Sequence, residues 1–205
     1  MITTKDKREY YQALLDKSSG FRETFSRIMG AAPTKLGHSN ILKASWLDTK
    51  LGPMIAIAND EALYLLEFVD RTGLERAVER LRAKTKSAIV PGHTQAISSI
   101  EKELKLYFDC KLIEFKTPLF LLGSPFQKQV WEELKKIPSG KTRSYLDLAK
   151  VIGKPSAFRA VANANGANQL AIVIPCHRVI NTNGELAGYG GGIARKQWLI
   201  NHEKG

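Results

Sequence analysis

The strongest chemical signal in this sequence is a cysteine followed directly by a histidine. Cys176 and His177 lie in the stretch IPCHRVI, residues 174–180, where Pro175 restricts the backbone just before the thiol. A thiolate is a strong nucleophile, and a nearby base or cation helps a cysteine to reach that form. Two interpretations compete: Cys176 is a reactive thiol, or it is a buried structural cysteine that has a histidine beside it by coincidence.

The segment before Cys176 predicts how the pair is presented. LAIVI, residues 170–174, has the composition of a short buried strand that would bring the thiol to the domain surface or to a pocket. Neighbouring side chains on an extended segment point to opposite sides. We therefore expect His177 to act on Cys176 through a water molecule or a backbone bend, and not through a direct hydrogen bond.

Capping signals predict three short helices upstream of the cysteine. The first begins at SPFQ, residues 124–127, where an N-cap serine, a first-turn proline and a capping-box glutamine follow one another. The second begins at SYLD, residues 144–147, and ends at GKP, residues 153–155. Ser156 opens the third. Because a tight glycine-containing turn joins the last two, they predict a helix-turn-helix.

The third helix, AFRAVANAN, is made mainly of small residues and has one arginine, Arg159. Base recognition in the major groove usually needs several long polar side chains. Small residues instead allow close approach to the minor groove, where a lone arginine can insert into the base stack. The alternative is that Arg159 pairs with a surface carboxylate. The residues expected to face DNA are Arg159, Ser144, Ser156, Ala157 and Ala160.

Composition favours a polyanionic partner. The 205 residues include 31 Lys and Arg against 20 Asp and Glu, which leaves a formal net charge of +11. Such a surplus suits nucleic acid, because each neutralised phosphate releases counterions. A solvated basic surface without a partner has the same composition, so the charge alone does not decide.

Cysteine usage and apolar runs argue against several classes of protein. Two cysteines are too few for a four-cysteine zinc site or a disulfide framework, and the four histidines have no metal-ligand spacing. No apolar run approaches membrane-spanning length, and the charged start MITTKDKREY is unlike a signal peptide. We therefore expect a soluble, cytoplasmic protein with no metal.

The first half of the sequence predicts an α+β unit without a chemical cluster. Residues 41–69 have the pattern of a three-stranded meander, and residues 73–84 and 93–108 that of two amphipathic helices. Cys110 follows the second helix and is expected to be a bystander.

The motifs in this order resemble the O6-alkylguanine-DNA alkyltransferases, also called methylated-DNA–protein-cysteine methyltransferases. IPCHRVI follows SY and AFRAVANANGAN, and GELAGYGGGIARKQWLINHE comes after it. The resemblance covers residues 124–205 densely and residues 41–120 loosely. It implies a ribonuclease H-like α+β domain with a small antiparallel sheet (39–121), followed by a winged-helix-like domain (122–205).

The resemblance also implies a role for each matching residue. Cys176 is the nucleophile and alkyl acceptor, His177 the base that acts through a water, and Glu203 the carboxylate that orients it, as in a hydrolase triad. Tyr145 protonates the departing guanine, and Asn168 braces the turn that holds the active site.

The same resemblance implies the substrate and how it is reached. The guanine pocket is formed by Val179, Tyr189, Gly190 and Gly191, and Arg159 is the finger that replaces the flipped nucleotide. The implied substrates are O6-methylguanine and O4-methylthymine in double-stranded DNA, extruded from the minor groove. A thioether is not easily reversed, so each monomer would act once, without any cofactor. Gly190 is smaller than the residue many members have there, which leaves the pocket size open.

The first 38 residues predict an extension to this core. SGFRETFSRIMGAAPTK resembles the end of an AraC-type DNA-binding domain, and YYQALLDKS faintly resembles adaptive-response (Ada-type) regulators. The extension is either a remnant helix or an arm that still touches DNA.

Two other functions fit parts of the pattern. A DNA-lesion sensor, as in alkyltransferase-like proteins that lack the acceptor cysteine, would use the same helix-turn-helix, but Cys176 argues against it. A thiol hydrolase would use Cys176, His177 and Glu203 and would turn over.

Overall fold

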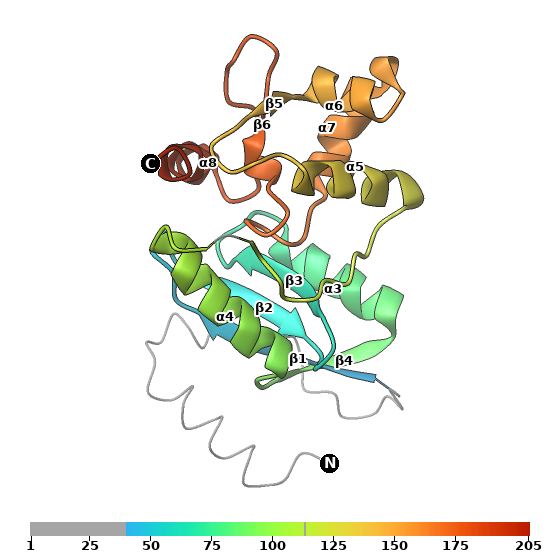
Figure 1. Ribbon diagram of the computed structural model, residues 1–205. Helices are drawn as coiled ribbons and strands as arrows, with labels where there is room; N and C mark the ends of the chain where they lie inside the picture. The colour runs from blue at the N-terminus through green and yellow to red at the C-terminus, as the bar shows by residue number, and fades with distance from the viewer. Residues whose placement is uncertain (1–39, 113) are drawn as a thin grey trace, which may run out of the picture.

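The computed structural model describes residues 40–112 and 114–205, and the extension with its AraC-type resemblance lies outside them. In Figure 1 a small sheet flanked by two helices forms the lower half, and a group of helices with the C-terminus forms the upper half. The expected mixed α+β class is confirmed.

The sheet of the lower half is mixed, whereas a purely antiparallel sheet was expected. Its strands, in the order β3-β2-β1-β4, are β1 (Asn40–Leu47), β2 (Met54–Ala58), β3 (Leu63–Phe68) and β4 (Ser87–Pro91). β1 to β3 form the expected antiparallel meander. β4, which the pattern did not predict, pairs parallel to β1 after the crossover through a helix that parallel pairing requires.

Two helices cover the two faces of this sheet. They are α3 (Leu74–Thr85) and α4 (Gln95–Phe108). Side chains of β2 alternate between the faces, because successive residues of a strand point to opposite sides. Ile55 and Ile57 pack with the buried side of α3, whereas Met54 and Ala56 join the core that contains α4. That second core continues into the upper half of the molecule, so the two halves share it.

The helices of the upper half begin where the capping signals indicate. The elements are α5 (Pro125–Lys135), β5 (Arg143–Ser144), α6 (Tyr145–Val151), η1 (Pro155–Ala157), α7 (Phe158–Gly166), η2 (Cys176–Arg178), β6 (Val179–Ile180) and α8 (Ile193–His202). Both predicted capping boxes form, at Ser124 with Gln127 and at Ser144 with Asp147.

The start of α7 differs from the prediction. Ser156 does not cap this helix, since it lies inside the 3-10 turn η1, and no side chain caps either η1 or α7. Pro155 leads the chain into that turn, so α7 begins only at Phe158, and the serine hydroxyl is too early in the chain to reach its free N–H groups.

The predicted strand at residues 170–174 is wrong. Leu170 makes a single parallel bridge to Leu66 of β3, and the chain then passes through turns, with Ile172 at φ 71°. The N–H of Ile174 donates to the carbonyl of Leu170 at 2.9 Å. The N–H of Ala171 donates to Leu66 at the bridge, whereas those of Val173 and Ile174 donate to carbonyls within the segment. The apolar run therefore reflects burial on all sides and not a continuous strand.

In the described part of the chain, no helix is both long and apolar enough to cross a membrane.

Candidate functional site

Asn168 holds together the turns that lead to the cysteine. Its side chain is buried; Oδ1 accepts from the N–H of Leu170 at 3.0 Å, and Nδ2 donates to the carbonyl of Ile174 at 2.9 Å. The same Nδ2 lies 3.1 Å from Sγ of Cys176. One amide therefore braces the segment and supplies a hydrogen-bond donor to the thiol.

Cys176, His177 and Arg178 form the 3-10 turn η2, hereafter the acceptor turn. The expectation of an extended segment is therefore wrong at this point, because the turn sends consecutive side chains in directions set by a helical backbone. Pro175 precedes the turn, and the N–H of Arg178 donates to its carbonyl at 3.0 Å.

The Glu203 carboxylate is the common acceptor of several hydrogen bonds next to the acceptor turn. It follows α8, and its carboxylate accepts from His177 Nε2 at 2.8 Å, from Arg178 Nε at 2.7 Å and from the Tyr107 hydroxyl at 2.8 Å. Burial by itself would raise the pKa of Glu203, but the hydrogen bonds from His177 and Arg178 hold it well below its ordinary value. The carboxylate is therefore ionised at neutral pH.

His177 is a neutral base with one free nitrogen. Its side chain is fully buried, and burial lowers its pKa below the ordinary value, although Glu203 acts in the opposite direction. Because Nε2 faces the carboxylate, we assign the proton to Nε2. Nδ1 is buried and has no hydrogen-bond partner among the described residues. It remains available to accept a proton.

Cys176 requires such a base. The residue is 7% exposed, and burial raises the pKa of its thiol to about 11, against the Asn168 hydrogen bond, which lowers it. The thiol is therefore protonated at neutral pH. Within the described residues no direct hydrogen bond joins Sγ to the His177 ring, and the action of His177 through a water stays a prediction.

Sequence reasoning missed three groups of this cluster. Tyr107 lies in the predicted helix of residues 93–108 and Arg178 in the motif IPCHRVI, and the sequence assigns neither of them a role in the site. Asn165, buried on α7, donates to the carbonyl of Cys176 at 3.3 Å. The sequence signal for Asn165 is that α7, a helix of mostly small residues, carries this second asparagine after Asn163. Its Oδ1 is buried without a partner among the described residues.

Tyr145, at the start of α6, lies half-buried in the same region. Burial raises the pKa of its hydroxyl first, the charge of Cys176 raises it further, and Asn165 lowers it. The hydroxyl is therefore protonated at neutral pH, as a proton donor must be.

The residues predicted to form the guanine pocket gather beside the acceptor turn. Val179 follows that turn and is buried, and its carbonyl accepts from Nζ of the buried Lys196. The segment Tyr189–Gly191, hereafter the lid loop, brings the Tyr189 ring to 6.5 Å from the His177 ring, edge to face. The Tyr189 hydroxyl is buried and has no partner among the described residues.

The predicted DNA-facing residues differ in exposure. Ser156, Arg159 and Ala160 are exposed, and Arg159 lies over the exposed Phe158 ring at 5.4 Å. Among the described residues no carboxylate forms an ion pair with Arg159, which was the alternative role considered for it. Ala157 is half-buried. Ser144 is buried, and its hydroxyl belongs to the capping box of α6, so it is not part of this exposed surface.

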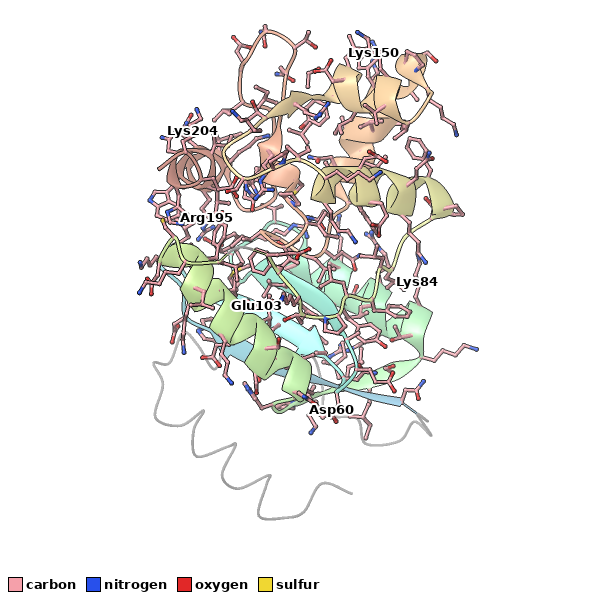
Figure 2. All side chains as sticks on the ribbon, viewed as in Figure 1. Asp60, Lys84, Glu103, Lys150, Arg195 and Lys204 are labelled. Atoms are coloured by element: carbon pink, nitrogen blue, oxygen red, sulfur yellow. The ribbon has the colours of Figure 1, made fainter. Side chains whose placement is uncertain are left out.

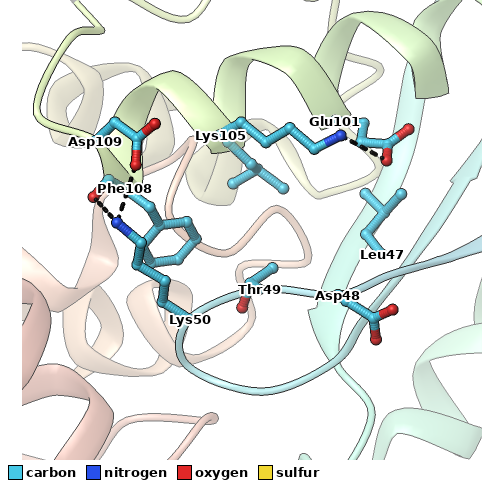
Figure 3. Close-up of a pocket in the computed structure, with 9 residues that line it drawn as sticks. Leu47, Asp48, Thr49, Lys50, Glu101, Lys105, Phe108 and Asp109 are labelled. Atoms are coloured by element: carbon cyan, nitrogen blue, oxygen red, sulfur yellow. Dashed lines mark hydrogen bonds and ion pairs between the residues drawn. The ribbon is translucent and has the colours of Figure 1, made fainter.

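One surface pocket reaches this cluster, because Tyr107, Pro175 and Arg178 are among the residues that line it, although Cys176, His177 and Glu203 are not. Two other pockets lie away from the cluster. Figure 3 shows one of ≈ 370 Å³ between the β1–β2 turn and α4, crossed by the ion pairs Lys50–Asp109 and Lys105–Glu101. It contains no member of the Cys176–His177–Glu203 group. We therefore locate the chemistry by the buried polar network and not by surface hollows. The described residues also contain no group of three or more His, Cys, Asp or Glu that could hold a metal ion.

Known proteins resemble this chain in sequence and in architecture. Residues 125–205 match the family model described as 6-O-methylguanine DNA methyltransferase, DNA binding domain. A methylated-DNA–protein-cysteine methyltransferase of Mycobacterium leprae is 41% identical over 158 residues, which is 77% of this chain and 90% of that protein. This chain belongs to the methylated-DNA–protein-cysteine methyltransferase family. A relative of the same name from Shigella flexneri is 39% identical over 164 residues, covering 76% of this chain and 91% of that protein.

Solved structures of methyltransferases have the same fold. The O6-methylguanine methyltransferase of Mycobacterium tuberculosis matches with a TM-score of 0.67 and 39% identity, over 80% of this chain and 93% of that one. Another structure of the Mycobacterium tuberculosis protein is a complex with DNA. The enzyme of Pyrococcus kodakaraensis matches with a TM-score of 0.58 and 25% identity, over 79% of this chain and 98% of that one.

The two cysteines should differ in reactivity toward a disulfide reagent at neutral pH. Cys110 is exposed, whereas Cys176 is buried with a raised pKa. We expect one fast thiol and one that reacts at least about tenfold more slowly. The measurement is the time course with which the reagent's own thiol is released as the protein cysteines attack it. Cys110→Ser should remove the fast phase. A fast phase that survives Cys110→Ser would contradict the assignment.

Proposed function

We propose that this methyltransferase repairs DNA by moving the alkyl group of O6-methylguanine onto Sγ of Cys176. The observation that carries the proposal is the neutral, buried imidazole of His177, which is held by an ionised Glu203, has a free Nδ1 and follows directly after a residue with a protonated thiol. Nothing else in the described residues combines a nucleophile, a base and an orienting carboxylate.

The transfer is a displacement at the alkyl carbon. The Cys176 proton passes through a water to Nδ1 of His177, and the thiolate attacks the methyl carbon as its bond to O6 breaks. Glu203 stabilises the imidazolium that forms. The electron pair of the broken bond stays on guanine, which takes a proton from the Tyr145 hydroxyl.

We further propose that each molecule acts once. The product is a thioether, and the proposed cluster contains no group that would cleave it. This distinguishes the protein from a thiol hydrolase, in which the same three residues would be regenerated. An acceptor thiol must stay reduced, and the two free cysteines favour a cytoplasmic location. We expect it to act as a monomer.

The target base has to leave the helix stack. An alkyl group on O6 cannot reach a buried thiol while the base is paired, so the nucleotide is flipped out. The exposed, small-residue surface of α7 supports approach from the minor groove, with Arg159 as the wedge. An alkylated O4 of a flipped thymine presents a similar carbon, so we include O4-methylthymine as a second substrate.

We also propose the finer fold and domain assignments. A helix-turn-helix of α6 and α7 beside the two-stranded β5-β6 sheet supports a winged-helix-like domain over 122–205. The sheet with α3 and α4 supports a ribonuclease H-like domain over 39–121, and residues 1–38 would be a separate extension.

The direct test is the mass of the intact protein after incubation with a duplex that contains O6-methylguanine. We expect one added methyl group, which is retained in Cys110→Ala and lost in Cys176→Ala. An unchanged mass together with normal DNA binding would indicate a lesion sensor. Release of more than one methyl group per protein molecule would indicate a turnover enzyme, and either result would refute the proposal.

Replacing Arg159 should separate base flipping from chemistry. In Arg159→Ala we expect alkyl transfer from duplex DNA to slow at least about tenfold, because the extruded nucleotide loses its replacement in the stack. Reaction with free O6-benzylguanine needs no flipping and should change little. Single-turnover rates on the two substrates give the comparison, and an equal loss on both would refute the wedge.

A further inference from the structure

The lid loop rests on the lower half of the molecule through two glycines. A Cβ added to Gly191 would lie 2.8 Å from Cδ2 of Phe68, and one added to Gly190 would lie 2.6 Å from Nε of Arg71. Neither glycine has a positive φ, so the backbone does not require glycine at either position. The requirement is space, and at Gly190 the space is filled by Arg71.

Arg71 is fixed in that position by contacts at both ends of its guanidinium. Nη1 pairs with Oε1 of the buried Glu67, and Nη2 donates to the carbonyl of Gly166 at 3.1 Å. Gly166 is the last residue of α7, where a cation interacts favourably with the free carbonyls of a helix end. Nε is buried without a hydrogen-bond partner among the described residues. One side chain from the lower half thus contacts both α7 and the lid loop.

A second arginine holds the other end of the lid loop. Arg195 of α8, labelled between the two halves in Figure 2, donates to the carbonyl of Gly191 at 3.0 Å and pairs with both oxygens of Asp70. Its guanidinium lies 4.3 Å from the centre of the Phe68 ring. The lid loop is therefore supported by packed and ion-paired groups and has little freedom to move outward.

The Glu67–Arg71 pair is close enough to affect the acceptor thiol. After burial and the Asn168 hydrogen bond, the charges that act on the pKa of Cys176 are those of Glu67, which raises it, and of Lys196 and Arg71, which lower it. Glu67 and Arg71 act on Tyr189 as well. The close approach of Arg71 to Gly190 independently places this pair against the lid loop.

We propose that Arg71, held by Glu67, is a specificity-determining residue that fixes the lid loop and limits the size of the alkyl group transferred to Cys176. It occupies the volume that a side chain at position 190 would otherwise fill, so the small Gly190 does not widen the pocket. The inference rests on the proposed function, because it concerns the range of that same reaction.

The test compares two substrates in one duplex sequence, O6-methylguanine and O6-benzylguanine, by single-turnover rates. In Arg71→Ala we expect the benzyl-to-methyl rate ratio to rise about tenfold, since a pocket wall discriminates a few carbon atoms by factors of this order. Arg80→Ala removes the same charge from an exposed position on α3 and should leave the ratio unchanged. A ratio in Arg71→Ala that stays at the wild-type value would overturn the proposal. Absence of any transfer by the wild type would instead refute the proposed function.

Position 190 provides an independent arm of the same experiment. Gly190→Ala should slow methyl transfer at least about tenfold in the wild-type background, where Arg71 blocks the added carbon. In the Arg71→Ala background the same change should slow methyl transfer less than about twofold, because the effects of substitutions at two contacting residues are not additive. Equal factors in both backgrounds would contradict the contact.

Arg71→Lys keeps the inference testable if Arg71→Ala does not fold. A lysine can pair with Glu67 but lacks the second arm that reaches Gly166. We expect a melting temperature near that of the wild type and a benzyl-to-methyl ratio raised at least about twofold. An unchanged ratio in a folded Arg71→Lys would overturn the proposal.

Discussion

The Glu203 carboxylate, buried at the end of α8, accepts hydrogen bonds from His177 and Arg178 of the acceptor turn and from Tyr107 of α4. Burying a carboxylate is unfavourable unless charged and polar groups surround it, and removing one partner from a buried pair costs on the order of 3–5 kcal/mol. The partners of Glu203 compensate its burial and hold it ionised. Because the carboxylate is ionised, it fixes the His177 ring and leaves Nδ1 free.

The site depends on both halves of the molecule. The acceptor segment contacts β3 through the bridge from Leu170 to Leu66, and Tyr107 reaches Glu203 from α4. Arg195 links α8 to Asp70, and Arg71 links the end of β3 to Gly166. None of the Cys176, His177 and Glu203 side chains comes from the sheet of the lower half. Its part is to hold the acceptor turn, the carboxylate and the lid loop in fixed relation.

Local signals predicted the elements well and the route of the acceptor segment poorly. The capping boxes at Ser124 and Ser144 depend on three or four consecutive residues, so the sequence alone reveals them. The turns between Asn168 and Cys176 depend on one side chain bonding to residues up to eight positions away, and apolar composition alone cannot distinguish such turns from a buried strand. The resemblance implied that Glu203 orients His177; the two side chains are in contact, and the orienting role stays a prediction. Tyr107 could not be found in this way, because its partner Glu203 lies 96 positions later in the sequence. The contact of Arg71 with Gly166 spans 95 positions and is equally invisible to local patterns.

Burial keeps His177 neutral, and the hydrogen bond to Glu203 places its proton on Nε2, which leaves Nδ1 free to take the proton of Cys176. Nuclear magnetic resonance of the labelled imidazole nitrogens measures this directly in the unalkylated protein. We expect a protonated Nε2 and an unprotonated Nδ1 at neutral pH, with the imidazolium forming only below the ordinary histidine pKa of about 6.5. A doubly protonated ring at neutral pH, or a proton on Nδ1 in place of Nε2, would contradict it.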